Sequence, residues 1–194
     1  MKSKWIIIAL SLLLIVSVFF HVRYMNNEKR REKAFLRTAY FYITRIVSSV
    51  DRLDEYHSTG IYDDLNSEIG YLLKNIYTLD QTLKDGHLFV DDAIWPSGTE
   101  LGFEGIGLTI EGELHRNDKK YLIPFTEDGK LSENEAAYLN KLSQYLKEIK
   151  VLMTGKPGKI SENISISEFS EALGAFFKKW ENYYKTFPEA PSEL

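Results

Sequence analysis

The chain has no cysteine among its 194 residues. Disulfide bonds, zinc–thiolate sites and lipid-modified cysteines are therefore all excluded, and the fold must be held by core packing alone. The missing thiols give no indication of the redox compartment. Proline is scarce, with five in the chain, and neither proline nor glycine occurs in residues 24–32.

Basic residues are few in most of the chain. Residues 38–194 hold 16 Lys and Arg against 26 Asp and Glu, whereas residues 1–37 hold eight against two. Nucleic-acid binding requires basic groups that displace counterions, so the acidic body excludes that class of partner. An acidic body behind a basic N-terminal segment suits a domain held near an anionic membrane surface.

The first long uncharged segment lies near the N-terminus. It runs from Trp5 to Val22, interrupted by Ser11 and Ser17. A spanning helix needs about 20 apolar residues, so residues 1–23 are predicted to be a single transmembrane anchor. A cleaved signal peptide is the alternative, but no small-residue cleavage site follows the apolar core. We therefore expect an uncleaved signal anchor in the cell membrane.

A cluster of five basic residues follows the span: Arg23, Lys29, Arg30, Arg31 and Lys33. These side chains are predicted to contact anionic headgroups at the membrane surface. Their number favours a cytoplasmic domain by the positive-inside rule, although long domains can cross regardless of charge. The basic tip before the apolar core is the order of a secretory signal, and on this ground we predict an extracytoplasmic domain.

Four segments have apolar residues at helical spacing. They are Phe35, Ala39, Tyr42 and Ile46; Leu65, Ile69, Leu72, Ile76, Leu79 and Leu83; Leu139, Leu142, Leu146, Ile149 and Met153; and Phe169, Leu173, Phe176, Trp180 and Tyr183. Each row would bury one helical face, which predicts a four-helix bundle-like domain over residues 24–187. The first helix should continue unbroken from the membrane span to about Tyr56, and residues 188–194 should form a flexible tail.

Local signals mark the ends of these helices. Residues 58–60 separate the first helix from the second, and residues 85–86 are predicted to end the second. Ser132 and Glu135 form a capping box at the start of the third helix. Residues 155–158 stop that helix, and Ser167 is predicted to start the fourth.

The segment between the second and third helices has a different pattern. Residues 108–111 alternate between apolar and polar, residues 121–123 do so more weakly, and residues 115–119 have turn composition. This predicts a β-hairpin that pairs residues 104–114 with 120–126. The predicted fold class is therefore mainly α, with an N-terminal transmembrane helix and a four-helix bundle-like domain carrying an inserted β-hairpin.

No catalytic constellation stands out in the sequence. The four histidines occur singly, without the spacing that metal sites on one helix require. Residues 126–135 resemble the second half of an EF-hand calcium loop, but Pro124 and Thr126 stand where acidic ligands belong. A turn followed by a capping box explains the same residues. We predict no catalytic residue, no metal site, no cofactor and no enzyme activity.

Aromatic residues are abundant, at 13% of the chain. Their helical spacing is typical of core positions, and the alternative is an exposed surface for a partner. The candidates for such a surface are Trp95, Phe177, Trp180 and Tyr184. The prediction is a non-enzymatic interaction, assembly or accessory protein that binds the membrane and either another envelope protein or itself. A small-ligand sensor that signals through a partner, or an envelope hydrolase, is the alternative.

Overall fold

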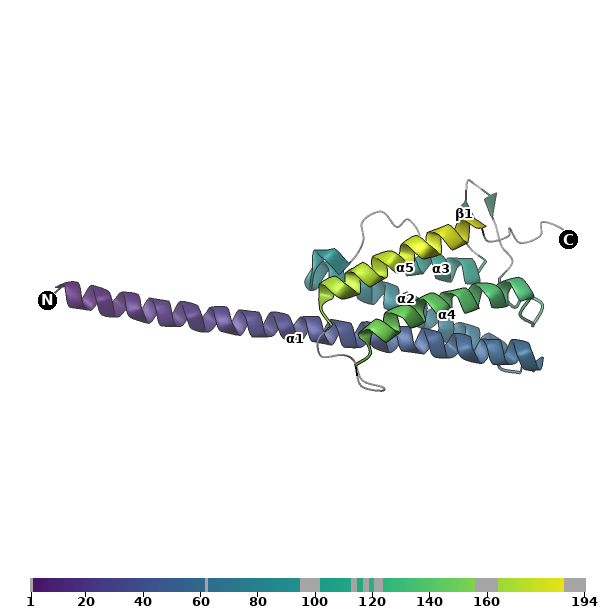
Figure 1. Ribbon diagram of the computed structural model, residues 1–194, viewed down its shortest axis with the longest axis horizontal. Coiled ribbons are helices and arrows are strands. Elements are labelled where there is room, and N and C mark those ends of the chain that lie inside the picture. Colours follow the sequence, from purple (N-terminus) through teal and green to yellow (C-terminus); the bar gives the residue numbers. More distant parts are fainter. Residues whose placement is uncertain are drawn as a thin grey trace.

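The computed structural model is mainly helical (Figure 1). It describes residues 2–61, 63–94, 102–112, 115–116, 119–120, 124–155 and 164–186. Within these ranges the helices are α1 (Lys2–Thr59), α2 (Leu65–Phe89), the short 3₁₀ helix η1 (Asp92–Ile94), α3 (Gly102–Ile110), α4 (Glu133–Met153) and α5 (Ile166–Thr186). The predicted tail lies outside the described residues.

Helix α1 is continuous over 58 residues, which confirms the prediction of a single helix through the apolar run and into the bundle. At 1.5 Å per residue it is about 87 Å long. Its N-terminal part projects from the bundle as a stalk (Figure 1). From Leu10 to Val22 its large apolar side chains are all exposed, whereas Ala39, Ile43 and Ile46 are fully buried. One helix therefore provides both the stalk and part of the domain core.

Polar contacts fix the directions of the neighbouring helices. Arg52 of α1 pairs with Glu68 near the start of α2, at 2.7 Å, so α2 runs back toward the stalk. Helix α4 also runs antiparallel to α1. Its Asn140 donates to Asp54 at 2.7 Å, and Thr154 just beyond its end lies 3.4 Å from the Tyr40 hydroxyl. The C-terminal ends of α2 and α4 therefore both lie at the stalk end of the bundle.

The four predicted apolar rows form the core. Of the residues in these rows, only Tyr42 and Tyr183 are partly exposed. Aromatic rings from three helices pack at its centre. Phe103 of α3 stacks on Phe176 at 5.1 Å, and Trp180 stands edge-on to Tyr138 of α4 at 4.9 Å. The bundle prediction is confirmed at this level.

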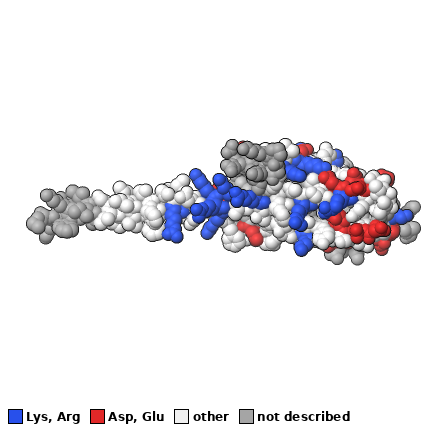
Figure 2. All heavy atoms as spheres, turned by 90° about the horizontal axis from the view of Figure 1, so that it is seen from below, with Lys and Arg blue, Asp and Glu red and all other residues white. Residues whose placement is uncertain are grey.

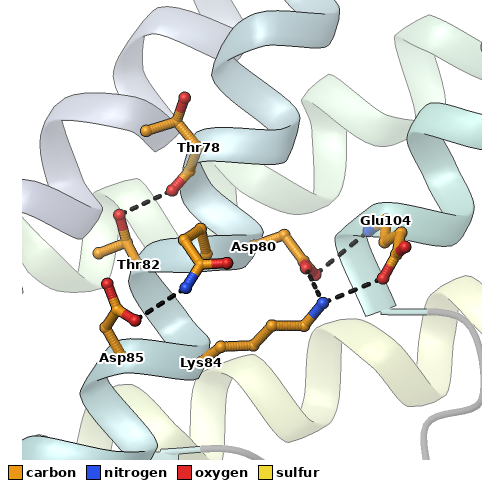
Figure 3. Close-up of polar contacts among 7 residues, drawn as sticks. Thr78, Asp80, Thr82, Lys84, Asp85 and Glu104 are labelled. Carbon is orange, nitrogen blue, oxygen red and sulfur yellow. Dashed lines mark hydrogen bonds and ion pairs between the residues drawn. The ribbon is translucent and has the colours of Figure 1, made fainter.

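The predicted hairpin is wrong over its first strand, because residues 102–110 form helix α3. Glycine-rich sequence forms a helix poorly alone, so tertiary contacts must stabilise it. The buried carboxylate of Asp80 accepts a hydrogen bond from the Glu104 backbone N–H at 3.2 Å (Figure 3). Gly107 lies against the Tyr77 ring, where a Cβ would be 2.7 Å from Cζ. These contacts hold α3 on α2.

Two short strands follow α3: β1 (His115–Arg116) and β2 (Lys119–Lys120). They pair antiparallel over two residues each, with His115 opposite Lys120 and Arg116 opposite Lys119. This pairing is far shorter than the predicted hairpin, and residues 121–123 of its second strand lie outside the described residues. An inserted hairpin of the predicted extent is not supported.

Two predicted helix ends shift and one capping box is confirmed. The Ser132 hydroxyl accepts from the Glu135 N–H at 3.3 Å, and the Glu135 carboxylate accepts from the Ser132 N–H at 2.7 Å. Helix α5 begins at Ile166, with Ser165 and not Ser167 as the residue bonded to the first turn. Helix α2 continues past Gly86 to Phe89.

Candidate membrane-facing site

The basic cluster lies where the stalk enters the bundle. We call Arg23, Lys29, Arg30, Arg31 and Lys33 the basic collar, and all five are exposed. At 1.5 Å per residue they lie about 2–16 Å beyond Val22, the end of the apolar run. Figure 2 shows Lys and Arg gathered at this neck and Asp and Glu gathered toward the opposite end of the bundle. On the face drawn, basic residues therefore gather nearer the stalk and acidic residues farther from it.

The end of α2 lies beside this collar, because α2 runs antiparallel to α1. Its last turn and the start of η1 form a closed turn over residues 87–92, here named the α2–η1 corner. The N–H groups of Val90 and Asp91 both donate to the Gly86 carbonyl, at 2.9 and 3.0 Å. The His87 ring Nδ1 lies 2.7 Å from the Asp92 carbonyl oxygen, so this nitrogen carries the donated proton. These bonds fix the corner's shape.

The corner exposes two large apolar side chains. Leu88 is 70% exposed and Phe89 is 71% exposed, although both are the last residues of a helix whose other face is buried. An open cavity of about 290 Å³ separates the corner from α1. On the α1 side it is lined by Tyr24, Glu28 and Arg31. The corner thus faces the first residues beyond the apolar run.

Polar groups line much of this cavity. A hydrogen bond to Glu28, followed by the charge of that carboxylate, raises the pKa of the Tyr24 phenol. The Asp91 carboxylate accepts the Ala93 N–H at 2.9 Å. Tyrosine next to an apolar run is typical of the headgroup level of a bilayer. The cavity and the corner therefore have the mixed polar and apolar character of a membrane interface.

Two of the predicted partner residues lie in the core and not at this site. Phe177 is 4% exposed and Trp180 is 2% exposed, so both are core residues. Tyr184 is half-buried at the edge of the core, and Trp95 lies outside the described residues. Sequence reasoning missed Leu88 and Phe89, although a signal was present. Both lie off the apolar row that ends at Leu83, so the helical spacing places them away from the core.

The other polar candidates stabilise turns and helix ends. His57 lies 3.0 Å from the Leu131 carbonyl oxygen and 3.5 Å from the Glu133 carboxylate. In the EF-hand-like segment, Asp128 accepts the Lys130 N–H at 3.1 Å, next to Gly129 with φ +75°. Across the described ranges, no group of three or more His, Asp or Glu side chains could hold a metal ion.

Comparisons of the chain with protein-family models, with curated proteins and with solved structures found no match.

Proposed function

We propose that this protein is a single-pass membrane-anchored protein whose extracytoplasmic helical domain binds another membrane or envelope component without catalysing a reaction. The observation that carries the proposal is the continuous helix α1. It is long and apolar enough to cross a membrane, and none of its apolar window is buried in the protein. Exposed apolar side chains around the whole helix need a cover, and lipid supplies one.

The continuity of α1 makes the domain a rigid extension of its anchor. No proline or glycine occurs between Val22 and Phe35, where the core begins, so the helix has no local cause for a kink. A domain presented in this way has a fixed distance and a fixed direction relative to its own membrane span. Such presentation suits an assembly or accessory protein that meets its partner at a defined distance from the membrane.

Exposed apolar residues near the stalk end supply a candidate partner surface. On the last turn of α4, Val151 is 74% exposed and Leu152 is 44% exposed. On α1, Phe41 is 48% exposed, and the Arg45 guanidinium lies 4.5 Å from its ring centroid. Apolar side chains beside an arginine are the composition found at the centres of protein interfaces.

Thiol labelling tests the anchor and the side of the membrane together. Because the chain has no cysteine, Ile61→Cys introduces a single thiol at a site that is 58% exposed and far from the stalk. We expect a membrane-impermeant maleimide to label this variant in intact cells. Labelling only after lysis would place the domain in the cytoplasm. Release of the protein from membranes by alkaline carbonate would contradict the anchor.

Photo-cross-linking tests the partner. A photoreactive amino acid at Val151 should give a discrete adduct in membranes, and mass spectrometry should identify the captured protein as a membrane or envelope component. The same amino acid at Ile61, which is also exposed but lies at the other end of the bundle, is the matched control. Equal adducts at both positions, or none at Val151, would contradict a specific surface on α4.

A small-ligand sensor is the second candidate, and the cavity beside the α2–η1 corner favours it. Its volume of about 290 Å³ is at the lower end of ligand-site volumes, and its lining offers Arg31 for an acidic group and Glu28, Asp91 and Asp92 for a basic group of a small ligand. A thermal-shift screen of small charged metabolites tests this candidate. A shift that disappears in Arg31→Ala would support a sensor, and the absence of any shift would count against it.

A further inference from the structure

We propose that the α2–η1 corner is a second membrane contact, in which Leu88 and Phe89 insert into the headgroup layer of the bilayer that holds α1. This inference rests on the proposed membrane anchor and deepens it by naming lipid as the partner of the corner. The occupant is identified by position, by charge and by the apolar character of the two exposed side chains.

The corner lies opposite residues of α1 that follow the apolar run closely. Glu28 and Arg31 line the cavity opposite the corner. They lie about 9 and 13 Å beyond Val22 at 1.5 Å per residue. The headgroup layer adds about 5–8 Å to each side of the hydrocarbon core. Spanning helices tilt by about 20° on average, which lowers one side of the bundle toward the membrane. The corner lies about one interhelical distance, roughly 8–10 Å, from the α1 axis, so a tilt toward α2 lowers it by about 3 Å.

The two apolar side chains of the corner are exposed. Leu88 and Phe89 are about as exposed as Val151 of α4, and they are adjacent on one turn. The preceding turns of the same helix bury Leu79 and Leu83 in the core. The hydrogen bonds to the Gly86 carbonyl hold in place the backbone that carries these two exposed side chains. Contact with lipid would cover them as they stand.

The basic collar lies on the same stretch of α1 as Tyr24, Glu28 and Arg31, which line the cavity beside the corner, and it is attracted to anionic headgroups. Three carboxylates oppose this attraction on the corner side, namely Glu28, Asp91 and Asp92. Glu28 bonds to Tyr24 and Asp91 bonds to the Ala93 N–H. A fourth acid, Glu32, lies between Arg31 and Lys33. The five basic groups of the collar still outnumber these four acids, and the acidic far end of the bundle is directed away from the membrane.

Depth-dependent quenching tests the contact on the full chain. Leu88→Cys, Ile61→Cys and Leu14→Cys each carry one thiol for an environment-sensitive fluorophore, and all three native side chains are exposed. The labelled proteins are reconstituted into vesicles of phosphatidylcholine and phosphatidylglycerol in equal parts, with or without doxyl-labelled lipid. We expect a blue shift and strong quenching at position 88, full quenching at position 14, and neither effect at position 61.

The outcomes separate the two proposals. Quenching at position 14 without quenching at position 88 overturns the corner contact and leaves the anchor intact. No quenching at position 14 overturns the anchor itself. Equal quenching at positions 61 and 88 overturns a contact specific to the corner. In vesicles of phosphatidylcholine alone the quenching at position 88 should weaken, since the collar then lacks anionic headgroups, and unchanged quenching would overturn the role of the collar.

Discussion

The ring of Phe35 occupies the space that a side chain at Gly86 would need. A Cβ built on Gly86 would lie 2.3 Å from Cε2 of that ring. The ring cannot move aside freely, since Phe35 is buried and also packs edge-on against Phe169 of α5 at 5.7 Å. This close approach joins α1, α2 and α5 at the stalk end of the bundle, immediately before the α2–η1 corner.

Gly86→Ala should therefore destabilise the domain by about 1–3 kcal/mol through overpacking. Gly70→Ala is the matched control, because Gly70 lies on the same helix and nothing lies within 4 Å of a Cβ built there. That control should stabilise the domain by up to about 1 kcal/mol through helix propensity. Denaturant unfolding of the full chain in detergent measures both, and a stabilising Gly86→Ala would contradict the packing.

Asp80 should be important for docking α3. Its carboxylate accepts the Glu104 N–H at 3.2 Å and pairs with Lys84 at 2.7 Å, as Figure 3 shows. Asp80→Ala should cost about 1–3 kcal/mol, because a backbone donor of α3 loses its partner in a buried setting. Glu104→Gln should cost less than about 1 kcal/mol, since that ion pair is exposed. Equal losses from the two variants would argue against this role of Asp80.

Two ion pairs of α1 should differ in strength. Glu68 has a side chain that is 9% exposed and pairs with Arg52, whereas Asp51 and Lys147 are each about half exposed. Arg52→Ala should cost about 1–3 kcal/mol by leaving a buried carboxylate without its partner. Lys147→Ala should cost about 0–1 kcal/mol. Unfolding midpoints in denaturant rank the two variants, and the reverse ranking would contradict this account.

Tyr138 should make the domain sensitive to alkali. Burial raises the pKa of its phenol above the usual value of about 10, so the neutral form is favoured in the folded state. The associated stability is fully present below about pH 10 and is lost as the pH rises further. Tyr138→Phe should reduce this alkaline loss, whereas Tyr71→Phe, at a position that is 56% exposed, should not. Thermal unfolding of the parent chain and both variants across that pH range measures the effect. Identical pH profiles for the parent and Tyr138→Phe would contradict it.

Asn27→Pro should break the rigid link between stalk and bundle. Proline in a helix interior removes a hydrogen bond and costs about 3 kcal/mol locally. The bundle should stay folded because its core begins at Phe35. Spin labels at Leu14 and Glu55 should lie about 60 Å apart in a straight helix. Their distance distribution should be narrow in the parent chain and in Asn27→Ala, and shifted or broad in Asn27→Pro. A narrow distribution in all three would contradict the expected kink.

Much of the fold follows from residue spacing alone. The apolar rows of α2 and α4 are regular enough to predict both the helices and their buried faces, and an uninterrupted segment between the span and Phe35 predicts the continuous α1. The capping box at Ser132 follows from a local rule that needs no tertiary information. These features were predictable because their causes lie within a few residues of one another.

Helix α3 was not predictable in the same way. Three of its nine residues are glycine, and the alternating residues 108–111 at its end imitate a strand. What makes it helical lies on α2, namely the Asp80 carboxylate and the Tyr77 ring that needs a glycine beneath it. The predicted end of α2 at residues 85–86 was wrong for a related reason. Gly86 allows close packing against the Phe35 ring, and the helix continues past it to Phe89. The burial of Phe177 likewise depends on α3, because its ring packs edge-on against Phe103.

The shared helix α1 also makes the domain a lever. Thr59 lies about 55 Å beyond Val22 along a straight helix. A change in span tilt of about 20°, which is the average tilt of such helices, would sweep the far end of the bundle sideways by roughly 19 Å. A lipid contact at Leu88 and Phe89 would limit that sideways displacement on one side only. Small changes in bilayer thickness would then be converted into large, directional displacements of the acidic end.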